Sequence, residues 1–190
     1  MSIISENIGG NNSGTNSGYV IELILIDVKD VDNILDPIYF GDATKPMTVL
    51  NGNVEVNIDA KVYRIKFRTK SCGFTEALTS TMHGKAYNPN IDFDLPKVNK
   101  DLSAWLHKNR NRKWIALYKD ANDCCYISGE PDFGLQLSMG RKISSATNST
   151  GVSLAGVYLH QSWFLESLDI NLLSQSTFNN DFSEDFEVGY

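Results

Sequence analysis

The chain has 190 residues, a mass of 21.2 kDa and a formal net charge of −6. With 42% hydrophobic and 11% aromatic residues it can build a core, which excludes a wholly disordered chain. Its longest aliphatic run is Leu23 to Ile26, far short of the roughly 20 apolar residues that a membrane-spanning helix needs. The first residues lack the basic and apolar regions of a secretory signal, and three cysteines cannot all pair. We therefore expect a reducing, cytoplasmic context rather than a disulfide scaffold.

Charge is unevenly distributed along the chain. All 17 lysines and arginines lie between residues 19 and 165, together with 16 acids, so this part is nearly neutral. The last 25 residues hold six acids and no base. An acidic tail of this kind is either solvated or an interaction arm. The nearly neutral body argues against DNA binding as the main activity, because affinity for phosphate comes from concentrated Lys and Arg.

Composition divides the chain into three parts. Residues 1–18 are rich in Gly, Asn and Ser and cannot bury a core, so we expect a polar N-terminal arm. Residues 19–168 carry alternating and apolar patterns and form the predicted β-rich domain. Residues 169–190 form a predicted acidic, aromatic C-terminal arm.

The first part of the domain is predicted to consist of strands. The segment 19–28 is apolar on both faces apart from Glu22, which indicates a central strand covered on both sides. Asn51-Gly52 lies between two short apolar stretches and predicts a hairpin. Residues 60–70 alternate between apolar and basic side chains, as in a strand with one buried face.

A long, loosely patterned strand is expected over 74–85, and Asn88-Pro89-Asn90 predicts a turn before a strand at 91–95. One helix is predicted over 98–109, because Val98, Leu102, Trp105 and Leu106 form a single apolar stripe. Further strands are expected at 114–118, 124–127, 133–139 and 153–165. The predicted class is α+β, mostly β: an antiparallel sandwich or a partly closed barrel, with one packed helix and extended N- and C-terminal arms. The patterns leave both architectures open.

The sequence shows no catalytic or metal-binding motif. His83, His107 and His160 have no spacing typical of a metal site or a catalytic group, so we interpret them as structural. Cys124 and Cys125 are adjacent and point to opposite faces of a strand, so they cannot chelate one ion together. We predict buried thiols, no enzyme and no cofactor; a zinc site of Cys72, His83 and one of the paired cysteines is the alternative.

Two charged patterns lie on predicted strands. Asp92 and Asp94 share one face, which we interpret as a solvated strand edge. Four bases also share one face: Arg64, Lys66, Arg68 and Lys70. Like charges on one face repel each other and need balancing. Acidic groups of the same chain or of a neighbouring subunit, open solvent, or DNA could each balance them, and we predict a position near a subunit boundary or a channel.

The C-terminal arm has aromatic residues at every fourth position: Phe178, Phe182, Phe186 and Tyr190. Large apolar groups in a polar tail usually dock in a groove. We predict that these residues anchor the arm on another subunit, and the alternative is an arm that folds back on its own body. In the first case a chain that ends at Leu168 should still fold.

The stretch from Lys113 to Asn122 (KWIALYKDAN), with Tyr126-Ile-Ser-Gly129 and Gly134-Leu-Gln-Leu-Ser138 after it, resembles small tail and neck proteins of tailed bacteriophages of Bacteroidetes, including crAss-like phages. The long strands from Lys61 to Pro96 are also similar, and the resemblance covers about residues 54–168. Two features differ: Asp123 stands where those proteins have a turn glycine, and the last hairpin loop, 144–152, is longer. Asp tolerates the left-handed geometry of such a turn better than most residues.

The resemblance implies a virion structural protein: a tail-tube, terminator or neck-ring subunit that forms a homomeric six- or twelvefold ring on the DNA passage. Its partners would be neighbouring neck or tail proteins, with possible non-specific contact with genomic DNA and none with a membrane. It would be made in the bacterial host cytoplasm and function in the virion. The alternative is a carbohydrate- or receptor-binding β module of the virion, whose aromatic residues would gather on one exposed face.

Overall fold

A computed structural model describes residues 18–67, 70–82, 84–96, 100–144 and 148–176. The fold is mostly β with two α-helices, and its sheets do not close into a barrel. The predicted α+β, mostly β class is therefore confirmed, and the layered architecture rather than the barrel is the one observed. Most of the two predicted arms, residues 1–17 and 177–190, lies outside the described residues.

The described elements comprise thirteen strands, two α-helices and three 3-10 turns. In chain order they are β1 Val20–Asp27, η1 Val28–Asp30, β2 Val31–Ile34, α1 Pro37–Phe40, β3 Thr48–Val49, η2 Asn51–Asn53, β4 Val54–Asn57, β5 Val62–Lys66, β6 Cys72–Thr81, β7 Gly84–Pro96, α2 Lys100–Asn109, β8 Lys113–Asp120, β9 Cys125–Ser128, β10 Leu135–Ile143, β11 Asn148–Ala155, β12 Trp163–Leu165, η3 Ile170–Leu172 and β13 Ser174–Ser176.

Strands β1 and β8 pair antiparallel at the centre of the molecule. Side chains on both of their faces are buried: Leu23 and Leu25 belong to one core, and Ile24 and Ile26 belong to another. The predicted central strand, covered on both sides, is therefore confirmed. It has no polar face because neither side meets water.

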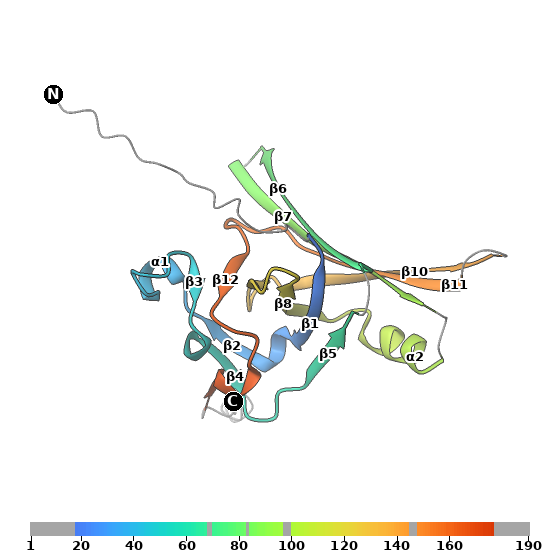
Figure 1. Cartoon of the computed structure of the whole chain (residues 1–190), viewed down its shortest axis with the longest axis horizontal. Helices are drawn as coiled ribbons and strands as arrows, with labels where there is room; N and C mark the ends of the chain where they lie inside the picture. The colour runs from blue at the N-terminus through green and yellow to red at the C-terminus, as the bar shows by residue number, and fades with distance from the viewer. Residues whose placement is uncertain (1–17, 68–69, 83, 97–99, 145–147, 177–190) are drawn as a thin grey trace, which may run out of the picture.

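The large sheet forks at β8. One edge of β8 pairs with β1, and β1 pairs in turn with β5. The other edge of β8 pairs with β10 at its start and with β9 farther along. Gly129 lies at the fork with φ +105°, and a side chain there would meet the Trp114 carbonyl oxygen at 2.9 Å. Only glycine fits this position. One branch runs β9–β12–β3, and the other, which we call the wing, runs β10–β11–β7–β6 (Figure 1).

The first core lies between the β1–β8 layer and the wing. Helix α2 closes one end of this core: Leu106 is buried, and Trp105 packs its ring against Tyr63 and Trp114. The predicted helix and the predicted apolar face of strand β5 are confirmed. The described helix spans Lys100–Asn109, and residues 97–99, which include the predicted start, lie outside the described part of the chain.

The second core lies on the opposite side of β1 and β8, under a small sheet of order β13–β4–β2. Leu173 is buried in it, and β13 pairs parallel with β4. The body therefore continues to Ser176, and the predicted boundary at residue 168 is too early. A chain cut after Leu168 would lose part of this core, so from the structure we expect it to be less stable than the full chain, in contrast to the sequence-based prediction that it folds unchanged.

The hairpin predicted at Asn51-Gly52 is wrong. Residues 51–53 form a 3-10 turn, after which β4 pairs with β2, whereas β3 pairs parallel with β12. The side chain of Asn51 is buried and bonds the backbone of Ser167 and Asp169. A tertiary role for this asparagine separates the two flanking strands into different sheets.

The turn predicted at Asn88-Pro89-Asn90 is also wrong, because β7 runs straight through it. The chain reverses instead just before Gly84, which has φ +123°. The Pro89 carbonyl accepts a hydrogen bond from Gly156, on the side away from β6. The missing N–H of Pro89 points to that same side, where β11 has already ended, so the proline costs no bond to β6.

Three smaller predictions also differ from the structure. The strand predicted over 153–165 breaks at Gly156 into β11 and β12, and the hairpin loop predicted over 144–152 is only 144–147, since Ile143 pairs with Asn148. A second helix, α1, was not predicted; Asp36 caps it and Pro37 begins it. Asp123 takes φ +65°, the left-handed geometry expected of a residue in place of a turn glycine.

Candidate functional site

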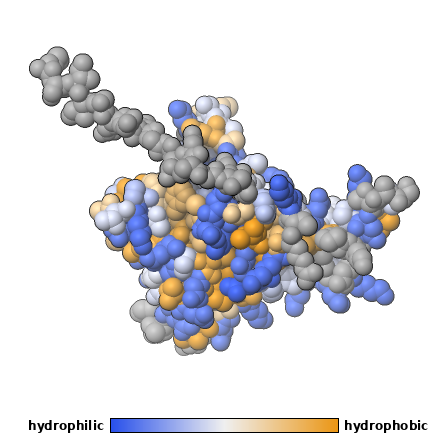
Figure 2. Space-filling view, viewed as in Figure 1, coloured by the Kyte–Doolittle hydropathy of each residue, from blue (hydrophilic) through white to orange (hydrophobic). Residues whose placement is uncertain are grey.

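The wing is the candidate functional site, because its two hairpins project beyond the cores. The β6–β7 hairpin and the β10–β11 hairpin leave the body in different directions (Figure 1). Large apolar residues are exposed along them: Leu78, Met82, Met139 and Ile143. Met82 is 96% exposed and Ile143 is 72% exposed. Both projecting ends carry hydrophobic residues among hydrophilic ones (Figure 2).

The inner face of the wing joins the first core near the body. Cys72 and Phe93 are buried there, and Phe74 and Leu137 pack against the same cluster. Alternation along each strand puts the exposed Leu78 and Met139 on this inner face too: Leu78 lies farther out along β6, and Met139 lies on the edge strand in the same row as Cys72 and Phe93. The projecting part of the inner face therefore carries exposed apolar side chains, Leu78, Met139 and Ile143, among polar ones.

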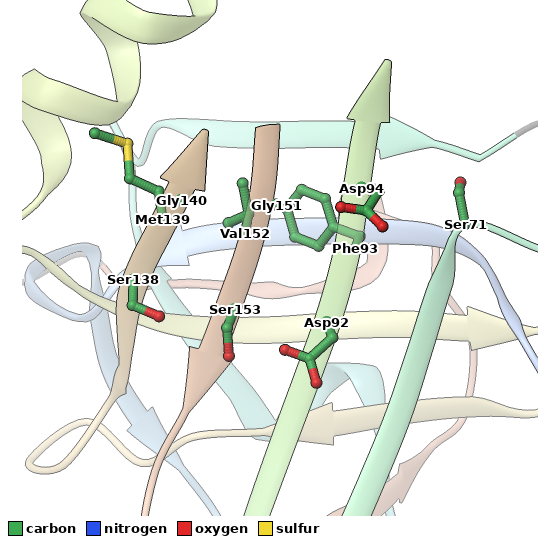
Figure 3. Close-up of a pocket in the computed structure, with 10 residues that line it drawn as sticks. All are labelled: Ser71, Asp92, Phe93, Asp94, Ser138, Met139, Gly140, Gly151, Val152 and Ser153. Atoms are coloured by element: carbon green, nitrogen blue, oxygen red, sulfur yellow. The ribbon is translucent and has the colours of Figure 1, made fainter. Parts of the chain in front are cut away.

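The outer face of the wing carries small polar residues. It has a shallow groove of about 320 Å³ whose lining includes Ser71, Asp92, Asp94, Ser138 and Ser153 (Figure 3). Ser138, Ser153 and Asp92 lie side by side on three neighbouring strands. Asp92 accepts a hydrogen bond from Asn90, and Ser153 donates one to the same asparagine at 2.7 Å.

The predicted carboxylate pair, Asp92 and Asp94, is exposed on one face, as the sequence suggests, but β7 is an inner strand of the wing and not an edge. The paired glycines Gly140 and Gly151 leave the floor of the groove open. The groove has no aromatic side chain on its floor that could stack on a sugar, since Phe93 points into the core.

Both edges of the wing are open. β6 pairs only with β7, and β10 pairs with β8 only through Leu135 and Gln136, so its remaining length has no strand beside it among the described residues. The base of β6 is fixed to the body by a chain of hydrogen bonds. Tyr118 and Ser128 hydroxyl oxygens lie 3.1 Å apart, Ser128 and Ser162 2.6 Å apart, and Glu76 accepts two bonds from Ser162.

Burial changes the acidity of groups around this base. It raises the pKa of the Cys72 thiol to about 12, and the charge of Asp92 adds to the effect. Burial also raises the pKa of the Tyr118 and Tyr158 hydroxyls well above the usual range for tyrosine. All three groups therefore stay protonated and uncharged at neutral pH, as in a structural rather than a nucleophilic setting.

The predicted basic row is only partly described. Arg64 Nε lies 3.0 Å from Glu22 Oε1, and Lys66 Nζ lies 4.0 Å from the same oxygen. The Lys70 ammonium lies over the Tyr19 ring at 5.7 Å, and Arg68 lies outside the described residues. Two of the four bases thus have an acidic partner within the chain. The predicted position of the row at a subunit boundary or a channel stays a prediction.

The four predicted anchors of the C-terminal arm, Phe178, Phe182, Phe186 and Tyr190, lie outside the described residues. Their docking stays a prediction as well.

His83, part of the alternative zinc site, lies outside the described residues. Within the described ranges, no group of three or more His, Cys, Asp or Glu side chains is placed to hold a metal ion. His160 stacks on Trp163 with ring centroids 3.9 Å apart, and its Nε2 lies 2.6 Å from Glu130 Oε1. Cys72 is buried as predicted, but Cys124 is exposed and Cys125 is half-buried.

A small aromatic cleft lies beside the base of the wing. Its volume is about 160 Å³, and its lining includes Tyr19, Phe74, Tyr118, Tyr126 and Asp120. The rings of Tyr118 and Tyr126 are stacked 5.3 Å apart, and Tyr126 donates a 3.4 Å hydrogen bond to Asp120. The cleft is the place where aromatic side chains gather near the surface.

Comparison with protein-family models, with curated proteins and with solved structures finds no match to this chain. Neither helix in the described part of the chain is long and apolar enough to cross a membrane.

Sequence reasoning missed the open edges of the wing, although a signal was present. Strand β6 runs for ten residues without Lys, Arg or Pro, the residues that commonly protect an exposed edge. The exposed apolar cluster of α1, Ile38, Tyr39 and Phe40, was missed too, because three consecutive apolar residues look like a core segment.

Proposed function

We propose that this protein is a non-enzymatic structural subunit of a bacteriophage virion, which forms a homomeric ring in the neck or tail. The observation that carries this proposal is the projecting wing with its uncovered apolar residues. Burying a side chain of this size is worth about 1.5–3 kcal/mol, so several of them favour association. In a heterologous contact, one patch of each copy binds a different patch of the next copy. Repeating that contact gives a closed ring when the last copy meets the first.

The outer face of the wing supports a place on a DNA passage. Its side chains are small and polar, and its two carboxylates, Asp92 and Asp94, repel phosphate rather than bind it. Such a face would let DNA pass without holding it. The proposal includes no cofactor and no membrane contact. Neighbouring neck or tail proteins are the proposed further partners, with the acidic C-terminal arm as the proposed contact.

The proposal is tested on the purified full-length chain by native mass spectrometry and by class averages from electron microscopy. We expect a closed ring, six- or twelvefold. Replacing two exposed wing residues by Asp, as Leu78→Asp and Ile143→Asp, should reduce the ring to monomers without lowering the melting temperature. Ile38→Asp is the matched control, because Ile38 is 64% exposed on α1, away from the wing. A wild-type chain that stays monomeric at high concentration contradicts the proposal.

The aromatic cleft supports a second candidate, a carbohydrate- or receptor-binding β module of the virion. Tyr126 beside the Asp120 carboxylate is a combination that a sugar ring can use, and the buried Tyr118 ring is stacked behind Tyr126. A glycan-array experiment separates the two candidates. Binding that is lost in Tyr126→Ala while the particle stays monomeric favours the second, and no binding together with a ring favours the first.

A further inference from the structure

We infer that the ring is joined by an antiparallel β-pairing in which strand β6 of one copy lies beside strand β10 of the next, with Leu78 opposite Met139. This inference rests on the proposed ring. It adds the identity of the two strands, their direction and their register, and the occupant of each open edge is a second copy of this chain.

Strand direction supports a head-to-tail contact. The wing has four strands and each pair is antiparallel, so β10 and β6, at opposite edges, run in opposite directions. Cys72 and Met139 lie in one row across the wing, so a contact with Leu78 opposite Met139 offsets adjacent wings by six residues along the strands, and the strands of a closed ring are inclined to its axis. A rotation about such an axis still leaves the two edge strands running in opposite directions. It therefore brings β6 of one copy antiparallel to β10 of the next, and the same contact repeats around the ring.

Among the described residues, the β6 edge lacks the usual protection of an exposed strand, whereas the β10 edge carries Arg141 and Lys142 near its end. Soluble proteins blunt long edges with Lys, Pro, bulges or short length. Strand β6 has ten residues and a single charged one, Glu76, whose carboxylate is turned toward Ser162 of the body. An edge this long and unprotected is suited to pairing with another strand.

The free main-chain groups can be assigned from observed hydrogen bonds. Tyr87 and Tyr158 exchange bonds of 2.8 and 2.9 Å, so odd-numbered residues of β7 bond away from β6. Alternation across the wing then leaves these residues facing the open edges: Phe74, Glu76, Leu78 and Ser80 on β6, and Leu137, Met139, Arg141 and Ile143 on β10.

Both sets of residues carry their side chains on the inner face of the wing. A continuous sheet requires this, because directly opposed residues share a face. The two edges therefore fit each other without turning one wing over, and the inner faces of adjacent copies would form one surface.

Side-chain chemistry selects one register. With Leu78 opposite Met139, Glu76 lies opposite Arg141 and Phe74 lies opposite Ile143. Two apolar pairs and one acid–base pair then form, an arrangement that stabilises cross-strand pairing, and Ser80 lies opposite Leu137. A shift by two residues in one direction places Leu78 opposite Arg141, and a shift in the other direction places Phe74 opposite Arg141.

The same register puts Ala77 opposite Gly140 on the outer face, as a pair that does not share hydrogen bonds. The Cα atoms of such a pair lie about 4.5 Å apart, within the range that a disulfide spans. Ala77 is exposed, and a side chain at Gly140 would meet no atom within 4 Å. Cysteine at both positions therefore tests the register with little disturbance of the subunit.

The experiment uses the full-length chain with Cys124→Ser, which removes the exposed natural thiol. We expect Ala77→Cys with Gly140→Cys to give, on mild oxidation, a ladder of covalent oligomers that ends at the ring number. Matched controls place the second cysteine two residues away, as Ser138→Cys or Lys142→Cys. These should crosslink at least tenfold more slowly, because the two cysteines are then offset from each other by about 6.8 Å along the strand.

Mixing the two single variants shows the direction of the contact. Equal amounts of Ala77→Cys and Gly140→Cys should yield mixed dimers only. Homodimers of Ala77→Cys alone would mean a twofold β6–β6 contact and would overturn the inference. A ring with no disulfide at this pair would also overturn it while the proposed function stands, whereas a monomeric wild-type chain would remove the proposed function itself.

Discussion

Asn51 lies where three parts of the chain meet. Its side chain donates to the carbonyls of Ser167 and Asp169 at 3.0 and 3.1 Å, and its Oδ1 accepts from the Ser167 N–H at 3.0 Å. The residue is buried, so each of these backbone groups depends on it for a partner. One amide therefore ties the C-terminal segment to the turn between β3 and β4.

We expect Asn51→Ala to lower the free energy of unfolding by about 2–4 kcal/mol, because several buried backbone groups lose their partner at once. Denaturant unfolding followed by circular dichroism measures this change. Asn53→Ala is the matched control in the same turn: its side chain makes one exposed bond, to the Phe40 carbonyl, and its loss should cost less than about 1 kcal/mol. Equal losses for both variants would mean that Asn51 has no special role.

Three buried groups release a proton more readily in the unfolded chain than in the folded one. The unperturbed pKa is 9.0 for the Cys72 thiol and 10.0 for the Tyr118 and Tyr158 hydroxyls, and burial raises the pKa of all three. Above pH 9 to 10 the unfolded chain therefore binds fewer protons than the native chain, and stability falls as pH rises. Each group contributes up to about 1.4 kcal/mol per pH unit above its unfolded pKa.

We expect denaturant midpoints to be level near pH 8 and to fall steeply between pH 9.5 and about 11, in the range set by these unfolded pKa values. Tyr158→Phe should reduce the fall, and its buried hydroxyl has no hydrogen-bond partner in the described part of the chain to lose. Tyr39→Phe, at an 80% exposed position, should leave the alkaline profile unchanged. A flat profile in the wild type would show that the buried groups do not govern alkaline stability.

At the scale of elements, the patterns that reflect burial were predictive. The apolar segment of β1, the alternation of β5 and two residues of the predicted α2 stripe, Trp105 and Leu106, each follow from contact with a core and lie where the sequence predicts them. The side chains of Val98 and Leu102, the other two residues of that stripe, are not among those described. The two failed turns share a physical reason. Asn51 and Pro89 both have strong local preferences for turns. Buried hydrogen bonds to a distant segment decide the position of Asn51, and Pro89 lies in a strand at a point where its missing N–H faces the end of β11. The residues next to them in the sequence indicate neither of these contacts.

The end of the body gives a prediction at the same scale. We expect a chain cut after Leu168 to unfold at markedly lower denaturant, because it loses the buried Leu173, the β13–β4 pairing and the Asp169 partner of Asn51. Loss of Leu173 alone removes about 1.5–3 kcal/mol of burial.

A chain cut after Ser176 is the matched control. It keeps every described contact of the body, so its melting temperature should equal that of the full chain in scanning calorimetry. If the proposed docking of the C-terminal arm holds, this shorter chain should also bind neighbouring subunits more weakly. A lowered melting temperature for the Ser176 cut would mean that residues 177–190 belong to the subunit's own core.

For the whole molecule, the layered β fold could be predicted, but the candidate site could not. The basic row was singled out for its charge, yet Arg64 and Lys66 share Glu22, a residue more than 40 positions earlier in the chain. The open edges of the wing depend on which strands lack a neighbour, and that follows only from the complete strand order. Hydrophobic periodicity indicates which face of a strand is buried. It does not indicate which strand, if any, pairs with each of its edges.

The strand order also sets a sequence of events during synthesis. The β6–β7 and β10–β11 hairpins join residues close in the chain and can form within microseconds. Strand β3 must wait for β12, and β4, which can pair early with β2, must wait for its second partner β13; both partners lie more than 100 residues later. At about 5–20 residues per second, strand β6 emerges several seconds before the second core can close. The nascent chain therefore exposes the open edge of β6 while the second core has not yet formed. The strand that we propose to join neighbouring copies is also the one that premature contacts between growing chains can reach for longest.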